Sequence, residues 1–362
     1  MAYQARQLGL VFNAALGVIM SLFLSLGAGT ILSGVGVADA LMQPARTYLQ
    51  IVGGFCILNA LIPICSSYLR AFGFSKEPLY ASIIGNVINF CLNAFFLFVL
   101  HKGVAGVATA TVISRIINLV IVVLLGAVLV KAKQHPERES NRAVMGQIIR
   151  IGLPSACETA IYNVSMTLVI RFLNQMDAEG LNVTARSYTM QITNFSYCVG
   201  AALAQANAIM TGWHIGAKEY DACDRGTKKA AVIGVIVAVI LETVFTLCSG
   251  WIMQLFSKDP QMVSLVGKLL AIDIVLEIGR GTNLVYGQAL KTSGDAVFPV
   301  VMGACFMILC SVGGTYLFGI RLGLLAVGAY IGMTGDECVR AVGMYLRWKS
   351  GKWKEKGLVK SR

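Results

Sequence analysis

Long apolar blocks separated by short polar segments dominate the chain. To within a few residues, the blocks run near 8–33, 47–69, 78–100, 104–130, 149–175, 183–212, 229–256, 262–289, 296–319 and 322–346. A helix needs about 20 mainly apolar residues to cross a bilayer. The strands of a membrane barrel are about ten residues long and alternate in polarity, which these blocks do not. The pattern therefore predicts an all-α membrane protein with about ten transmembrane helices.

Composition agrees with this prediction. Residues of the hydrophobic class make up 56% of the chain and charged residues only 13%. Soluble domains carry roughly 25% charged residues, because their surfaces face water. We therefore expect the lipid bilayer to surround most of this chain, and we do not expect a soluble protein.

The formal net charge is +12, and the basic residues gather in the polar segments. Placing residues 131–147 in the cytoplasm leaves few loop cations outside: Arg46, Lys102, Lys258 and Arg321. The excess of Lys and Arg in cytoplasmic loops then predicts both termini in the cytoplasm and the chain in the plasma membrane. No nucleic-acid-binding motif accompanies the positive charge, so no nucleic acid is expected as a partner.

The longest polar segment divides the chain into two predicted lobes. Residues 1–130 contain four helices, 131–148 form a cytoplasmic loop, 149–346 contain six helices, and 347–362 form a basic cytoplasmic tail. SYLRAFGFSKEPLYASIIGNVINF resembles YGQALKTSGDAVFPVVMGACFMIL, which indicates a parallel repeat of two pseudo-symmetric lobes. The repeat leaves the first two helices of the second lobe unmatched, so we expect that about two helices are absent from the N-terminal lobe.

Enzymatic chemistry is not expected. None of the ten cysteines forms a Cys-x-x-Cys pair, and the three histidines are isolated, so no metal site is predicted. Nucleotide-binding loops and catalytic signatures are also missing from the sequence. We predict no catalytic residues and no cofactor other than a coupling ion.

Several soft motifs occur in a fixed order along the chain. They are the Gly152-Leu153-Pro154 helix start, the small residues 200–202, the Gly216-Ala217 turn, GQALKTSGDAVFP and GDECVR. In this order they resemble the multidrug and toxic compound extrusion (MATE) transporters. The resemblance implies two six-helix lobes, of which this chain matches helices three to twelve. It also implies antiport of amphipathic, often cationic small molecules against protons or sodium, and we expect a monomer.

Ionisable residues inside spans are informative, because each costs about 2.5–3.5 kcal/mol to insert unless it faces a cavity or a partner. Glu158 follows Pro154 by one turn. It is either an ion-binding carboxylate, as the resemblance implies, or a carboxylate at a helix start near the interface. Asp273, Glu277 and Arg280 share one helix face. They form either a polar cluster in a central cavity or a structural ion pair. The resemblance aligns Arg280 with a position at which some sodium-coupled MATE transporters have an aspartate.

A second set of polar residues has weaker indications. Asp336 and Arg340 lie four residues apart on the last helix and predict a gating or structural ion pair. Arg186, at the start of the sixth span, is placed in the same class. Asn163 and Asn194 either join neighbouring helices by hydrogen bonds or line a substrate cavity.

Two alternatives to an antiporter stay open. Arg186, Arg280 and Arg340 are also suited to binding phosphates, as in a lipid-linked precursor flippase of the same superfamily. The unmatched helices also allow a fragment that inserts without transporting.

Overall fold

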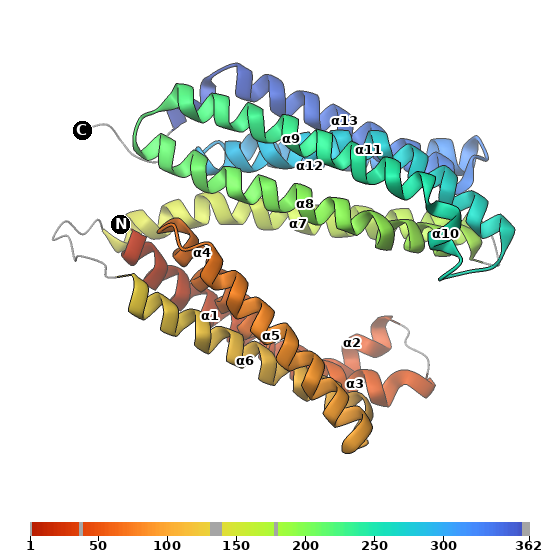
Figure 1. The fold of residues 1–362 in the computed structure, drawn as a ribbon, viewed down its shortest axis with the longest axis horizontal. Helices are drawn as coiled ribbons and strands as arrows, with labels where there is room; N and C mark the ends of the chain where they lie inside the picture. The colour runs from red at the N-terminus through yellow and green to blue at the C-terminus, as the bar shows by residue number, and fades with distance from the viewer. Residues whose placement is uncertain (1, 36–38, 131–139, 177–179, 357–362) are drawn as a thin grey trace. The chain divides into compact units, whose positions relative to one another are not determined.

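A computed structural model describes residues 2–35, 39–130, 140–176 and 180–356, and these residues are almost entirely helical, with no strand among them. The chain divides into two compact units, Met1–Ile148 and Ile149–Arg362. Each unit is built of long helices (Figure 1). The division into lobes proposed from the sequence stays a prediction, and the two units are described separately.

The first unit packs its helices mainly around α1 (Ala2–Leu26) and α6 (Gly103–Leu129). The elements between them are α2 (Ala28–Val35), α3 (Asp39–Gly54), α4 (Ile57–Ala71), α5 (Lys76–Ala94) and the π-helical turn η1 (Phe95–Val99). Helix α1 packs on α3 and α4, and α6 packs on α3, α4 and α5. Leu69 and Ala81 are fully buried in this core.

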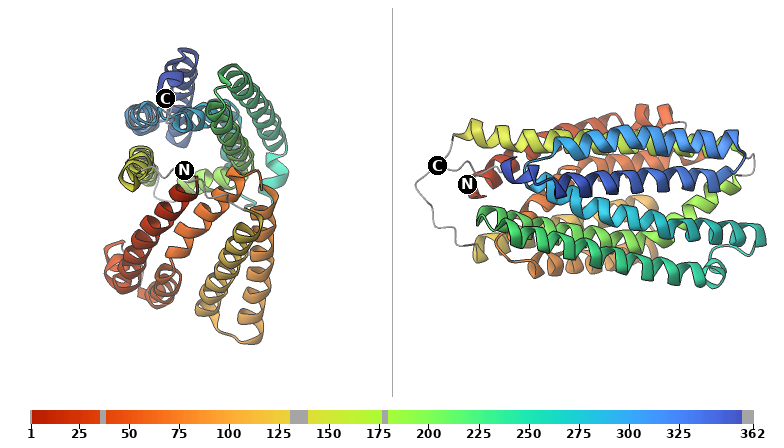
Figure 2. Two further views of the ribbon diagram at one scale, coloured as in Figure 1. Left: turned by 90° about the vertical axis from the view of Figure 1, so that its left-hand side faces the viewer. Right: turned by 90° about the horizontal axis from the view of Figure 1, so that it is seen from above.

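The second unit is organised around one helix. Its elements are α7 (Asn141–Met176, which begins in the first unit), α8 (Leu181–Gly216), α9 (Tyr220–Leu247), α10 (Ser249–Met253), α11 (Pro260–Thr292), α12 (Val297–Phe306), η2 (Met307–Val312), η3 (Thr315–Arg321), α13 (Leu325–Lys349) and η4 (Lys352–Lys356). Helix α11 packs against α8, α9 and α13, and the helices of this unit run lengthwise beside one another (Figure 2, right).

Close packing places α11 at the centre of this unit. Its start is fixed locally, because Asp259 accepts a hydrogen bond from the Gln261 amide at 2.9 Å and Pro260 occupies the first helical position. Leu269 and Leu276 are fully buried. A Cβ at Gly279 would lie only 2.9 Å from the α13 backbone. The glycine therefore permits the contact between α11 and α13 that brings their polar faces together.

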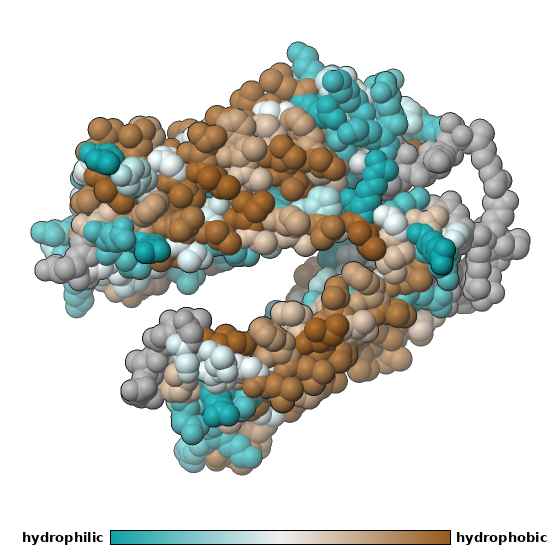
Figure 3. All heavy atoms as spheres, turned by 180° about the vertical axis from the view of Figure 1, so that it is seen from behind, coloured by the Kyte–Doolittle hydropathy of each residue, from teal (hydrophilic) through white to brown (hydrophobic). Residues whose placement is uncertain are grey.

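The outer faces of the helices are apolar. On α9, Ile236, Ile240 and Leu247 are exposed, whereas Ala231 and Ala238 are buried. Hydrophobic residues cover the middle of the helices and hydrophilic residues gather at helix ends (Figure 3). A large apolar outer surface is unfavourable in water and favourable in lipid. The units therefore present the surface expected of membrane helices.

Five described helices are long and apolar enough to cross a membrane, or six if the bent α3–α4 pair is one span. The sequence predicted about ten spans. The remaining long helices are α7, α8, α11 and α13. They are long enough to cross a membrane but less apolar, because they carry the polar residues of the cavity described below. All ten predicted blocks are helical, while the number of spans stays a prediction.

Helix limits differ from the predicted ones in three places. The first block breaks at Gly27 into α1 and α2, and the second bends by 41° between α3 and α4. The expected loop 131–148 is too long, because α7 already begins at Asn141; residues 131–139 lie outside the described part of the chain.

The predicted basic tail is partly structured rather than free. Trp353 in η4 is 1% exposed and stacks on Trp348 with ring centroids 4.1 Å apart. Asp295, in the turn between α11 and α12, accepts hydrogen bonds from Arg347 at 2.7 Å and Lys356 at 2.6 Å. The described part of the tail is therefore fastened to the unit.

Matching turns support the predicted repeat. Gly73 and Gly294 both adopt positive φ, 89° and 93°. In each turn the next residue donates its amide hydrogen to a carbonyl five residues earlier, Phe74 to Leu69 and Asp295 to Leu290. This is the Schellman arrangement that ends a helix, and it favours glycine at the left-handed position. Both turns then lead into helices that finish in π-helical segments.

Candidate functional site

A cavity of about 550 Å³ lies inside the second unit. Side chains from α7, α8, α11, α12, η2 and α13 line it, so the four long helices of lower apolarity all contribute to it. The lining includes eight of the residues predicted from sequence: Glu158, Asn163, Arg186, Asn194, Asp273, Arg280, Asp336 and Arg340. Glu277 does not line the cavity, but it forms an ion pair with Arg280, which does.

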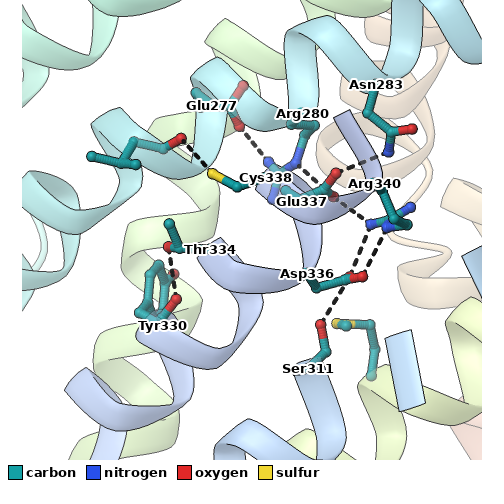
Figure 4. Close-up of polar contacts among 12 residues, drawn as sticks. Glu277, Arg280, Asn283, Ser311, Tyr330, Thr334, Asp336, Glu337, Cys338 and Arg340 are labelled. Carbon is teal, nitrogen blue, oxygen red and sulfur yellow. Dashed lines mark hydrogen bonds and ion pairs between the residues drawn. The ribbon is translucent and has the colours of Figure 1, made fainter. Parts of the chain in front are cut away.

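An unbroken chain of ion pairs crosses from α11 to α13 beside this cavity (Figure 4). Arg280 pairs with Glu277 on its own helix, and its Nε lies 3.6 Å from Glu337 Oε1. Asn283 donates a hydrogen bond to Glu337 Oε2 at 3.0 Å. Glu337 thus connects the two helices, a role that the sequence did not reveal.

The chain continues through Arg340. Its Nη2 lies 2.9 Å from Glu337 Oε1, and its Nε and Nη2 donate to the two oxygens of Asp336 at 2.8 and 2.9 Å. Ser311 of η2 donates to Asp336 at 3.0 Å. A bidentate guanidinium–carboxylate contact of this kind is both strong and directional. The predicted Asp336–Arg340 pair therefore exists, as one part of a five-membered network.

Glu158 has a partner that was not predicted. Lys291, near the end of α11, donates to Glu158 Oε2 at 2.6 Å, and the side chains are each 18% exposed. From sequence alone, Lys291 looked like a cytoplasmic loop cation. The pair lines the cavity, so Glu158 is not simply a carboxylate at a helix start.

The remaining predicted residues lie on α7 and α8. Arg186 is 6% exposed, its Nε has no partner, and its Nη2 contacts only Met166 Sδ at 3.5 Å. Asn163 donates to the Thr159 carbonyl of its own helix at 2.9 Å, so it does not join two helices. Asn194 lines the cavity. Interhelical bonding does occur elsewhere, between Asn207 and Thr227 at 3.3 Å.

Charges in the cavity wall are balanced. The lining carboxylates are Glu158, Asp273, Asp336 and Glu337, and the lining cations are Arg186, Arg280, Lys291 and Arg340. Most of these groups neutralise one another in pairs, whereas Asp273 Oδ2 and Arg186 Nε have no hydrogen-bond partner. Such an arrangement can bind an ion or a charged ligand by exchanging partners. Among the described residues, no group of three or more His, Cys, Asp or Glu side chains is placed to hold a metal ion.

Comparisons with known proteins agree on one family. The family model described as MatE matches residues 1–95 and 154–317. The uncharacterized transporter YisQ of Bacillus subtilis is 33% identical over 353 residues, covering 96% of this chain and 77% of YisQ. The probable multidrug resistance protein NorM of Thermotoga maritima is 21% identical over 362 residues, covering 94% of this chain and 76% of that protein.

Solved structures share the fold. The crystal structure of MATE in the straight conformation matches with a TM-score of 0.86 at 19% identity, covering 98% of this chain and 83% of that one. A MOP superfamily transporter from Pyrococcus furiosus matches with a TM-score of 0.84 at 18% identity, with the same coverage. Together with the cavity, these matches define a multi-pass, all-α membrane transporter. The chain belongs to the MatE family of multidrug and toxin extrusion transporters.

Proposed function

We propose that this transporter exports amphipathic, often cationic small molecules from the cell by antiport against protons or sodium. One observation carries the proposal: a cavity of about 550 Å³, bounded by helices with apolar outer faces, collects six of the seven predicted ionisable residues, all except Glu277. Groups of this kind inside a membrane are expensive and usually mark the path of an ion or substrate. The probable multidrug resistance proteins among the relatives support the substrate class.

The proposed mechanism is alternating access. Coupling ion and substrate compete for carboxylates of the cavity, and each stabilises a different state of the transporter. When Glu158 binds a cation, it would release Lys291 of α11, and when Glu277 binds one, it would release Arg280 within α11. Ion binding therefore changes the contacts of this helix. The plasma membrane and cytoplasmic termini belong to this proposal, since the family match supports only a membrane location.

Reconstitution in proteoliposomes tests the proposal. We expect a proton or sodium gradient to drive transport of ethidium, a fluorescent amphipathic cation, and Glu158→Gln and Glu277→Gln to slow it without preventing insertion. Asp221→Asn, at an exposed position on α9, is the matched control. If wild type and both glutamate variants transport ethidium equally, the roles assigned to Glu158 and Glu277 are wrong. If wild type does not transport ethidium, the proposed function is wrong.

A charge exchange separates a binding role of Glu158 from a structural one. In the double variant Glu158→Lys with Lys291→Glu, the ion pair is restored with reversed polarity. A purely structural pair predicts that stability and transport both recover. A carboxylate that binds the coupling ion from α7 predicts that stability recovers and transport does not.

One observation favours a second candidate, a flippase for lipid-linked precursors. Arg186 is a buried cavity cation without a carboxylate partner. Cations do not outnumber carboxylates in the lining, however, so the antiporter is preferred. If wild type in proteoliposomes accelerates the flipping of a fluorescent polyprenyl phosphate and Arg186→Gln does not, the flippase would be preferred.

A further inference from the structure

Glu242 is a carboxyl group that the proposed mechanism does not use. It lies on α9, is completely buried, and neither carboxyl oxygen has a hydrogen-bond partner of normal geometry among the described residues. Its neighbours Ile240 and Val244 face outward along the same helix and are exposed. An ionised carboxylate in such a place would lack water and an ion-pair partner, which is strongly unfavourable. The group therefore requires either a proton or a bound cation.

Three helices place polar groups against Glu242. From α11, it interacts electrostatically with Asp273, Glu277 and Arg280. Ser196 of α8 lies beside the carboxyl group, but its hydroxyl makes no hydrogen bond of normal geometry. The Thr246 hydroxyl, one turn further along α9, is also buried without a partner.

The nearby guanidinium groups are already engaged. Arg280 forms ion pairs with Glu277 and Glu337, and Arg340 forms ion pairs with Glu337 and Asp336. Asp273 is 2% exposed and leaves Oδ2 unpartnered. Glu242 and Asp273 are thus two buried carboxyl groups on packed helices that interact electrostatically, and neither forms an ion pair among the described residues. Two such groups cannot both be ionised at acceptable cost, so at least one proton must stay on the pair.

Only one member of the pair reaches the cavity. Asp273 belongs to the cavity lining, whereas Glu242 does not. Asp273 is therefore the member of the pair that can exchange a proton with the cavity. The described residues bring no third Asp, Glu, His or Cys to this place in metal-binding geometry, which favours a proton over a metal ion.

We propose that Glu242 and Asp273, with Ser196 beside them, form a proton-binding site between α8, α9 and α11 that is loaded from the cavity through Asp273. The role of this site in transport rests on the proposed antiport, whereas proton binding at the site does not. Binding itself is a simple protonation, in which a carboxylate oxygen and a proton from the cavity water form a carboxylic acid.

Infrared spectroscopy of the purified chain tests the binding step without transport. We expect wild type at neutral pH, in choline buffer, to show the C=O stretch of a protonated carboxyl group in apolar surroundings. Glu242→Gln, which keeps the shape of the neutral acid, should lose this band, and Asp221→Asn should keep it. A band unchanged in Glu242→Gln, or one abolished in wild type by adding sodium, would overturn the assignment.

Proteoliposomes then connect the site to transport. Under an imposed proton gradient, Glu242→Gln and Asp273→Asn should lose ethidium transport that wild type and Asp221→Asn retain. If wild type transports and Glu242→Gln does so equally, the site is wrong while the antiport stands. If wild type does not transport but the infrared band still depends on Glu242, the antiport fails and the proton site stands.

Discussion

Arg340 joins two carboxylates of the ion-pair network, because it contacts both Asp336 and Glu337. Removing one partner from a buried ion pair leaves an uncompensated charge and typically destabilises a protein by about 3–5 kcal/mol. We expect Arg340→Ala to lower the thermal unfolding temperature markedly. Arg321→Ala, at an exposed position, should change it little, and equal unfolding temperatures in the two variants would contradict the network.

Single residues also show the limit of reasoning from sequence. Glu158, Asp273, Arg280 and Arg340 were found because ionisable groups in apolar blocks are conspicuous. Lys291 was not found as the partner of Glu158, because the two lie 133 positions apart and nothing in the local sequence shows which helices meet. Glu242 is a lone carboxylate in its apolar block, and its burial depends on how α8 and α11 pack against α9.

At the scale of elements, Asp295 in the turn between α11 and α12 forms ion pairs with Arg347 at the end of α13 and Lys356 of η4. Burial raises the free energy of the ionised Asp295, but hydrogen bonds from Arg347 and Lys356 outweigh this effect and lower its pKa. A carboxyl group with a lowered pKa stabilises the fold above its unfolded value, about 3.9 for Asp, and this contribution disappears as pH falls through the folded value. The ion pairs of Asp295 should therefore hold η4 against the turn at neutral pH and be lost in acid.

Tryptophan fluorescence measures whether η4 is held against the turn. With Trp213 and Trp251 replaced by Phe, the remaining signal comes from the stacked Trp348 and Trp353. We expect the stack to open as pH drops below about 4, and to be open already at neutral pH in Asp295→Asn. A stack that stays closed in Asp295→Asn would show that apolar contacts of Trp353 alone hold η4.

Elements were more predictable than their details. Each apolar block became a helix because lipid offers no partners to backbone groups, so length and apolarity suffice. The bend between α3 and α4 and the folded tail were not predicted. Both depend on contacts made after the helices form, such as the stacking of Trp353 on Trp348.

At the scale of the whole molecule, the polar faces of α7, α8, α11 and α13 enclose one cavity, while apolar faces turn outward. The sequence showed which helices were least apolar, and it could not show that their polar faces converge. The central claim is that substrate binds in this cavity.

Cysteine protection tests that claim most directly. In a cysteine-free chain carrying Asn194→Cys, on the cavity wall, ethidium should slow labelling by a maleimide, while labelling of Lys258→Cys, an exposed position outside the lining, stays unchanged. Labelling of Asn194→Cys that is indifferent to ethidium, in a protein that transports it, would contradict the account.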